Sequence, residues 1–206
     1  ASPAVWSDHA LRLLQHPSPR VRALALERLA AEPRAELDAA VRQLLQDSDL
    51  EVRAEAIHYL CGGTDAAPET PVGEFLRHPD YAVVAGAVRA ISKYQWNGEG
   101  LIDQRFIERA LHQEGSQREA ARTAAAGALA LVAPDSPLLS YLNPLVLDGA
   151  LEVSRNAIRS CGKLQNRDGL PQLVSQIADS RLRHDVRQAL IQYGDGIVAT
   201  LDDYLH

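Results

Sequence analysis

The sequence predicts an all-α fold, an α-solenoid of about six helix pairs followed by a C-terminal half repeat. Three observations predict it. Similar segments such as VRALALERL (21–29) and VRAEAIHYL (52–60) recur at intervals of 31 to 38 residues, an interval typical of stacked helix pairs. Ala and Leu carry much of the apolar content, whereas aromatic residues make up only 5%. Eleven prolines and thirteen glycines lie mainly between apolar stretches, which suits short helices joined by tight turns.

The recurring segments are the second helix of each pair, here called the B helices. Aligned on their first residue, they carry apolar residues at positions 0, +4 and +5, and in five of six also at +8. These positions form one stripe on a helix, so each B helix should bury one side. The +5 residue is Leu26 in the first segment and Ile191 in the last. We expect the six first residues to be buried, namely Val21, Val52, Val83, Ala121, Val153 and Val186.

A second amphipathic stretch, the A helix, precedes each B helix. Ser18-Pro19, Asp49 and Asp80 stand at expected N-cap positions, and Ser116-x-x-Glu119 reads as a capping box. The single array 1–206 then divides into repeats at about 5–31, 35–62, 69–95, 101–133, 138–165 and 168–194, with a half repeat at 195–206. Because no B helix follows this half repeat and the chain contains no Met, we expect a fragment of a larger protein.

A Val-Arg dipeptide that opens a helix after an Asp-containing turn, as in DSDLEVRAEAIHYL, resembles the HEAT-repeat family. The resemblance covers essentially the whole chain and implies a right-handed α-solenoid. It also implies an Asp–Arg ladder between neighbouring repeats, with the Arg six residues after the Asp. Asp47 and Arg53 match this spacing, whereas Arg22 and Arg122 lack the Asp. An incomplete ladder is therefore expected.

The stretch 168–205 is similar to HEAT arrays that are attached, in some bacterial proteins, to a nucleotide-translocase-like membrane transporter. This narrower resemblance rests on generic repeat residues and implies a regulatory cytoplasmic domain of a bacterial membrane protein. The longest apolar run is far shorter than the roughly 20 residues that span a bilayer. We therefore expect this segment to stay outside the membrane, and both a transporter domain and a separate scaffold remain open.

Charge argues against a nucleic-acid partner. The net charge is −6, and neither half of the chain is basic: residues 1–103 hold 10 Lys and Arg against 15 Asp and Glu, and residues 104–206 hold 11 against 12. A nucleic-acid-binding surface gathers Lys and Arg into a stripe. The composition therefore favours a protein partner or another domain of the same parent chain.

Motifs that would indicate catalysis are missing from the sequence. There is no GxSxG, no phosphate-binding loop, no CxxC and no His-Glu dipeptide. His16 and His78 each precede Pro at the same turn position, so we interpret them as turn residues. Cys61 and Cys161 lie a hundred residues apart and are interpreted as structural thiols. We expect no enzymatic activity, metal or cofactor; a HEAT-like enzyme or nucleic-acid-binding module is the alternative.

The predicted partner-binding surface is the polar side of the B helices, here called the B-helix face. Positions −1, +3, +6 and +10 lie opposite the buried stripe. They hold the candidate site residues Arg20, Glu27, Glu51, Glu55, His58, Arg89, Lys93, Glu152, Asn156, Arg159, Lys163 and Gln192, together with Asp185. The fourth repeat contributes only Ala120, Ala124 and Gly127, a small-residue saddle that a partner helix or loop would fit. A solvated face without a partner is the alternative.

Trp96, in the long connection 94–100, is a secondary candidate for partner binding, because Trp is common among interface hot spots. The alternative is that its side chain folds back over a helix end.

Overall fold

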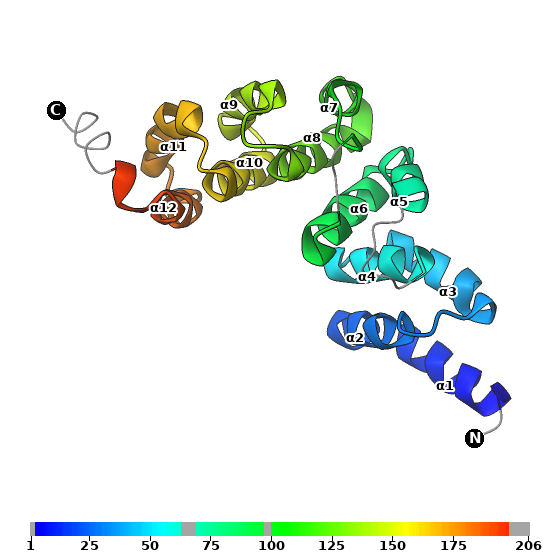
Figure 1. Cartoon of the computed structure of the whole chain (residues 1–206). Helices are drawn as coiled ribbons and strands as arrows, with labels where there is room; N and C mark the ends of the chain where they lie inside the picture. Colours follow the sequence, from blue (N-terminus) through cyan, green and yellow to red (C-terminus); the bar gives the residue numbers. More distant parts are fainter. Residues whose placement is uncertain (1–2, 63–68, 97–99, 198–206) are drawn as a thin grey trace. The chain divides into compact units, whose positions relative to one another are not determined.

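The computed structural model describes residues 3–62, 69–96 and 100–197. Within these ranges the chain forms twelve α-helices and eight short 3-10 helices, without any strand (Figure 1). The prediction of an all-α fold is therefore confirmed. None of the described helices combines the length and the apolar character that a membrane span requires. Most of the predicted half repeat lies outside the described residues, and the part within them ends in the 3-10 helix η8 (Gly194–Ile197).

Contacts between Cα atoms divide the chain into two compact units, Ala1–Leu101 and Ile102–His206. The helices of the first unit are α1 (Pro3–Leu14), α2 (Pro19–Leu29), α3 (Asp38–Gln43), α4 (Leu50–Leu60), α5 (Glu69–Leu76) and α6 (Tyr81–Tyr94), with the 3-10 turns η1 (Ala35–Leu37) and η2 (Leu44–Gln46) on either side of α3. Figure 1 shows α2, α4 and α6 in succession, and α4 packs against both of the others. Leu26, Ile57 and Ile91 are buried in the core of this unit.

The second unit repeats this pattern. Its helices are α7 (Gln104–Leu111), α8 (Arg118–Ala128), α9 (Leu142–Val146), α10 (Leu151–Leu164), α11 (Leu170–Ser175) and α12 (Arg183–Gln192), with 3-10 helices η3 (Gly115–Gln117), η4 (Leu129–Leu131), η5 (Pro137–Tyr141), η6 (Arg167–Gly169) and η7 (Gln176–Ala178) between them. Here α10 packs against both α8 and α12. Leu129, Ile158 and Leu173 are fully buried in its core. The predicted B segments thus fall on α2, α4, α6, α8, α10 and α12.

Burial of the B helices follows the predicted stripe at most of its positions. Five of the six first residues are fully buried, namely Val52, Val83, Ala121, Val153 and Val186. Val21 is only half-buried, and Ile191 is 68% exposed, so both expectations are wrong. Both residues lie on helices that contact a neighbouring B helix on one side only, α4 for α2 and α10 for α12.

Side-chain caps confirm two of the predicted helix starts and correct a third. The Asp49 carboxylate accepts hydrogen bonds from the backbone N–H groups at the start of α4, and Asp80 does the same at the start of α6. The capping box at Ser116 is wrong, because α8 begins at Arg118 without a side-chain cap. The 3-10 turn η3 replaces the cap, since the N–H of Arg118 bonds the carbonyl oxygen of Gly115.

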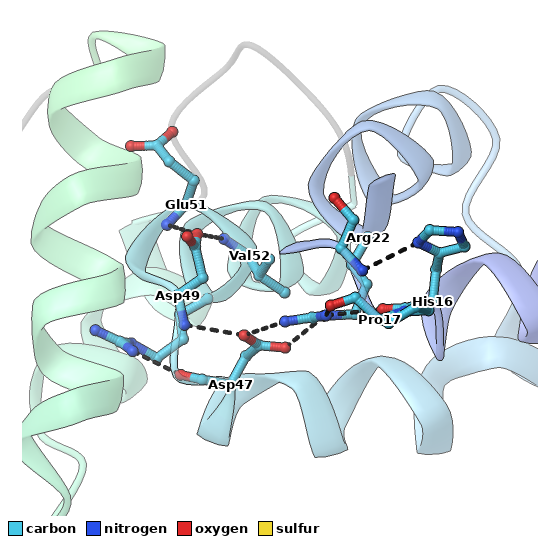
Figure 2. A network of polar contacts seen from close by, with 9 residues as sticks. His16, Pro17, Arg22, Asp47, Asp49, Glu51 and Val52 are labelled. Atoms are coloured by element: carbon cyan, nitrogen blue, oxygen red, sulfur yellow. Dashed lines mark hydrogen bonds and ion pairs between the residues drawn. The ribbon is translucent and has the colours of Figure 1, made fainter. Parts of the chain in front are cut away.

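A network of polar contacts joins the turn before α2 to the turn before α4 (Figure 2). The guanidinium of Arg22 donates two hydrogen bonds of 2.8 Å to the Asp47 carboxylate. The same guanidinium bonds the carbonyl oxygens of His16 and Pro17, at 2.8 and 3.0 Å. Arg53, which the family spacing pairs with Asp47, donates instead to the Asp47 carbonyl oxygen at 2.6 Å. The carboxylate therefore connects consecutive helix pairs, and its partner lies 25 residues earlier.

The second unit contains a corresponding contact between a B helix and the following turn. Arg122 on α8 lies 3.3 Å from the carboxylate of Asp148, in the turn before α10. Both side chains are largely buried, with 20% and 10% exposure. A contact between an Arg of one B helix and an Asp in the turn before the next thus occurs in each unit, and in both the Arg has no Asp six residues before it.

Candidate functional site

In the first unit, acidic residues of α4 form ion pairs with basic residues of α6 on the B-helix face. Glu51 and Glu55 are one helical turn apart, and so are Arg89 and Lys93. Lys93 Nζ lies 2.5 Å from a Glu55 carboxylate oxygen and 3.6 Å from one of Glu51, while Arg89 pairs with Glu51. Two carboxylates of one helix therefore face two cations of the next.

Glu55 is the buried member of this group, with only 1% of its side chain exposed. Its second carboxylate oxygen accepts a hydrogen bond of 2.6 Å from the Tyr94 hydroxyl. Burial, reinforced by this bond and the nearby carboxylate charge, raises the pKa of Tyr94 above its usual range. Burial would lower the pKa of Lys93, but the Glu55 and Glu51 carboxylates outweigh it and raise that pKa. Glu55 therefore has both oxygens bound, as a buried carboxylate requires.

Tyr94, which binds the Glu55 carboxylate, also belongs to an aromatic stack. The rings of His58 and Tyr94 are stacked with their centroids 3.7 Å apart, and Trp96 lies 5.7 Å from Tyr94 and 5.9 Å from His58. Gln95 ends α6 in the left-handed conformation, with φ 52°, and the N–H of Trp96 bonds back to Ile91. The chain therefore turns back after α6 and places Trp96 over this stack.

Three predicted site residues of the first unit are thus buried, not exposed. Glu55, His58 and Trp96 have 1%, 5% and 4% of their surface exposed. Glu55 is covered because Lys93 and Tyr94 reach across from α6, and His58 because Tyr94 stacks on it. The buried Trp96 agrees with the alternative given for it, a side chain that folds back over a helix end. Arg20, Glu27, Arg89 and Lys93 are exposed, and Glu51 is half-buried.

In the second unit, Asp185 at the start of α12 organises the B-helix face. Its carboxylate accepts one hydrogen bond of 3.0 Å from Arg155 and two, of 2.9 and 3.1 Å, from Arg159. Arg155 also pairs with Glu152 on its own helix. Asp185 was expected to be exposed but is 9% exposed, because the two arginines of α10 cover it. The two guanidinium groups are consequently held in fixed orientations.

The remaining predicted residues of the second unit reach solvent. The side chains of Glu152 and Arg159 are 53% and 61% exposed, and Lys163 and Gln192 are also exposed. Asn156 is half-buried and donates a hydrogen bond of 2.8 Å to the Glu152 carbonyl oxygen. On α8 the three small residues differ from one another: Ala120 is exposed, Gly127 is half-buried and Ala124 is buried.

Two polar residues of this surface were not selected by the spacing rule. Tyr94 follows Lys93 directly and binds Glu55, and Arg155 lies four residues before Arg159 and binds the same Asp185. Neither occupies position −1, +3, +6 or +10. Both side chains lie at the edge of the polar stripe and join the B-helix face because the neighbouring helix provides a partner for them. The sequence of a single segment does not contain this information, so the spacing rule could not identify the two residues.

The described residues contain no group of three or more His, Cys, Asp or Glu side chains arranged to hold a metal ion. His16 and His78 serve as turn residues, since the Nδ1 atom of each accepts a backbone hydrogen bond from the residue two positions later. Cys61 and Cys161 are buried free thiols, and burial raises the pKa of each to about 12. Thiols with such a pKa are weak nucleophiles at neutral pH.

No protein-family model matches the sequence, and no curated protein shows a significant match to it.

Replacing Tyr94 by Phe should destabilise the first unit by about 2 kcal/mol, because a buried carboxylate loses one of its hydrogen-bond donors. Tyr141 is the matched control, since its hydroxyl lies 3.2 Å from the carboxylate of Glu108 in a less buried contact. Tyr141→Phe should therefore cost clearly less. The free energy of unfolding from urea titrations measures both. Equal losses in the two variants would contradict the importance of the buried Glu55 contact.

Proposed function

We propose that this chain is a non-catalytic scaffold, a HEAT-like α-solenoid that binds a protein partner or another domain of its parent chain on the B-helix face. The observation that carries the proposal is the ordered charge on this face in both units. Glu51, Arg89 and Lys93 are held together in the first unit, and Arg155, Arg159 and Asp185 in the second. Charged side chains that are already fixed lose less conformational entropy when a partner binds.

The pairing of these charges supports a protein partner over a nucleic acid. Arg89, Lys93, Arg155 and Arg159 each contact a carboxylate. A phosphate backbone is bound through cations that exchange counterions for phosphates, and the carboxylates beside these four cations oppose this. Mixed charge with fixed geometry instead gives the complementarity that selects a protein surface.

Site-specific photo-crosslinking in cells tests the proposal. A photoreactive amino acid is placed at exposed B-helix positions, Arg20 on α2 and Gln192 on α12, and at exposed A-helix positions, Gln43 on α3 and Arg105 on α7. We expect one common adduct from the two B-helix positions and none from the A-helix positions. A partner captured only through the A helices would show that the wrong face has been chosen.

Charge reversal provides a second test with the partner so identified. Arg89→Glu combined with Arg159→Glu should weaken binding at least about tenfold, because both side chains lie exposed on the B-helix face and repulsion replaces attraction. Circular dichroism should report unchanged helix content. Arg105→Glu, on an exposed A-helix position, is the control and should leave the affinity unchanged. Full binding by the double variant would argue against this surface.

A further inference from the structure

The first unit has two junctions between successive B helices, and different polar contacts hold them. At the α2–α4 junction, the Arg22 guanidinium binds the carboxylate of Asp47, 25 residues later, and both side chains are almost closed to solvent. At the α4–α6 junction, Glu51 forms ion pairs with Arg89 and Lys93 on the B-helix face. Their side chains are 41%, 42% and 34% exposed. Solvent therefore reaches the ion pairs of the second junction but hardly reaches the pair of the first.

The buried Arg–Asp contact is missing from the α4–α6 junction because the position of its carboxylate holds a histidine. Arg53 on α4 corresponds to Arg22 on α2, and the Nη1 atom of each donates to the carbonyl oxygen six residues earlier. The residue 25 positions after Arg53 is His78. The Nε atom of Arg22 binds Asp47, whereas the Nε atom of Arg53 is buried without a hydrogen-bond partner. Arg53 thus keeps the bond to its own turn and lacks the bond to the next one.

His78 preserves the other role of the residue at this position. The Asp47 carboxylate accepts a hydrogen bond from the N–H of Asp49, and the Nδ1 atom of His78 accepts one from the N–H of Asp80. The turn before α6 therefore forms in the same way as the turn before α4. Burial lowers the pKa of Arg53, although the neighbouring carboxylate charges oppose this. Only the contact between the helix pairs is lost.

The second unit shows the same alternation. Arg122 of α8 makes the buried contact with Asp148, at the α8–α10 junction. The corresponding residue of α10 is Ser154, which is fully buried and donates to the carbonyl oxygen of Val146. The α10–α12 junction is held on the B-helix face, where Asp185 pairs with two arginines of α10. Each unit thus has one junction with a buried Arg–Asp contact, followed by one with ion pairs on the B-helix face.

We propose that the α4–α6 junction is sensitive to ions, so that α6 opens away from α4 more often as ionic strength rises, while the α2–α4 junction stays closed. Dissolved ions screen charges that are open to solvent and have little effect on buried pairs. Tyr94 and Lys93 shelter the carboxylate of Glu55, so the ions act on the pairs of Glu51.

The same device would respond to a charged ligand, because Glu51, Arg89 and Lys93 also belong to the B-helix face. The inference itself concerns the packing of helices within one chain. It holds with or without a partner on that face, so it does not rest on the proposed function.

Hydrogen exchange of backbone amides, followed by nuclear magnetic resonance on the full chain, tests the inference. Amides at buried positions of α6, such as Val88 and Ile91, should exchange about two- to fivefold faster at about 1 M sodium chloride than at about 0.01 M. The amide of Leu26, buried on α2, should change clearly less. The ratio of the two helices removes any effect of salt on the whole protein.

Three variants assign the response to the residues named. Glu51→Gln should give α6 fast exchange already at low salt, with little further change at high salt. His78→Asp should supply the missing carboxylate to Arg53 and slow the exchange of α6 at least about threefold at both salt concentrations. His16→Asp is the matched control, because it makes the same substitution before α2, where the chain has no preceding B helix to provide an Arg. It should leave the exchange of α6 unchanged.

The inference is overturned if salt leaves the exchange of α6 unchanged, if α2 responds as strongly as α6, or if Glu51→Gln keeps the full response. It is also overturned if His78→Asp folds, with an unchanged helical signal, but protects α6 no better than His16→Asp does. The salt comparison on the unaltered protein requires no variant, so it decides the matter even if a variant does not fold.

Discussion

Replacing Asp47 by Ala should lower the free energy of unfolding by about 2–3 kcal/mol. Its carboxylate and the Arg22 side chain are only 7% and 13% exposed. An exposed ion pair contributes at most about 1 kcal/mol, and breaking a fully buried pair costs about 3–5 kcal/mol. The expected loss for this largely buried pair lies between these two values. The substitution also removes the acceptor for the Asp49 N–H. Urea unfolding at neutral pH measures the loss.

The effect of Asp47 should depend on pH in one direction. Burial alone would raise the pKa of Asp47, but hydrogen bonds from Arg22 and the Asp49 N–H, with the charges of Arg22 and Arg53, lower it below its usual range. A lowered folded-state pKa means that the contribution is complete above the unfolded-state pKa of about 4 and is lost as pH falls through the folded-state pKa. The stability difference between wild type and Asp47→Ala should therefore shrink below about pH 4.

Asp179 provides a matched control for this pair. It occupies the corresponding turn before α12, but its carboxylate pairs with Arg181, two residues away. Hydrogen bonds from Arg181 lower the pKa of Asp179 to about 2. This contact is local and open to solvent, however, so solvent screens the two charges and the pair should contribute little to the free energy of unfolding. If Asp179→Ala destabilised the protein as much as Asp47→Ala, the role assigned to contacts between helix pairs would be wrong.

Gly162→Val should destabilise the second unit by about 3 kcal/mol, the upper range for overpacking a core. A Cβ atom at Gly162 would lie 2.7 Å from the Cα and 2.9 Å from the Cβ of Ala189 on α12. Contacts this short force the helices apart, since neither the Cα nor the Cβ of Ala189 can rotate away. The melting temperature and the urea midpoint should both fall.

The displacement would also reach the candidate site. Asp185 lies one helical turn before Ala189 on α12, and it orients Arg159 on α10. Moving α12 should therefore weaken the contact that holds this guanidinium. Gly149, whose added Cβ would meet no atom within 4 Å, is the control, and Gly149→Val should change stability by less than about 0.5 kcal/mol. A stable Gly162→Val protein would show that α10 and α12 do not depend on this close approach.

Sequence reasoning succeeded where the physical cause is local. The periodicity of VRAEAIHYL depends on residues within two turns of one helix, and the segment forms α4 with Val52 and Ile57 fully buried. The caps at Asp49 and Asp80 likewise involve backbone N–H groups two or three residues away. The helical class of the described residues and the two capped B-helix starts could therefore be predicted from the chain alone.

Tertiary structure decided which members of the polar stripe reach solvent. The angular position of Glu55 on α4 marks the side it lies on, but its burial depends on Lys93 and Tyr94, 38 and 39 residues later. Likewise, the Asp47 carboxylate binds the guanidinium of Arg22 and not that of Arg53. The residue pattern within one segment does not show how far a neighbouring helix extends, or which long side chains that helix contributes to the contact. The order and class of the helices were thus determined by local sequence, whereas the charge pairs and the exposed part of the B-helix face were decided by how adjacent helices pack.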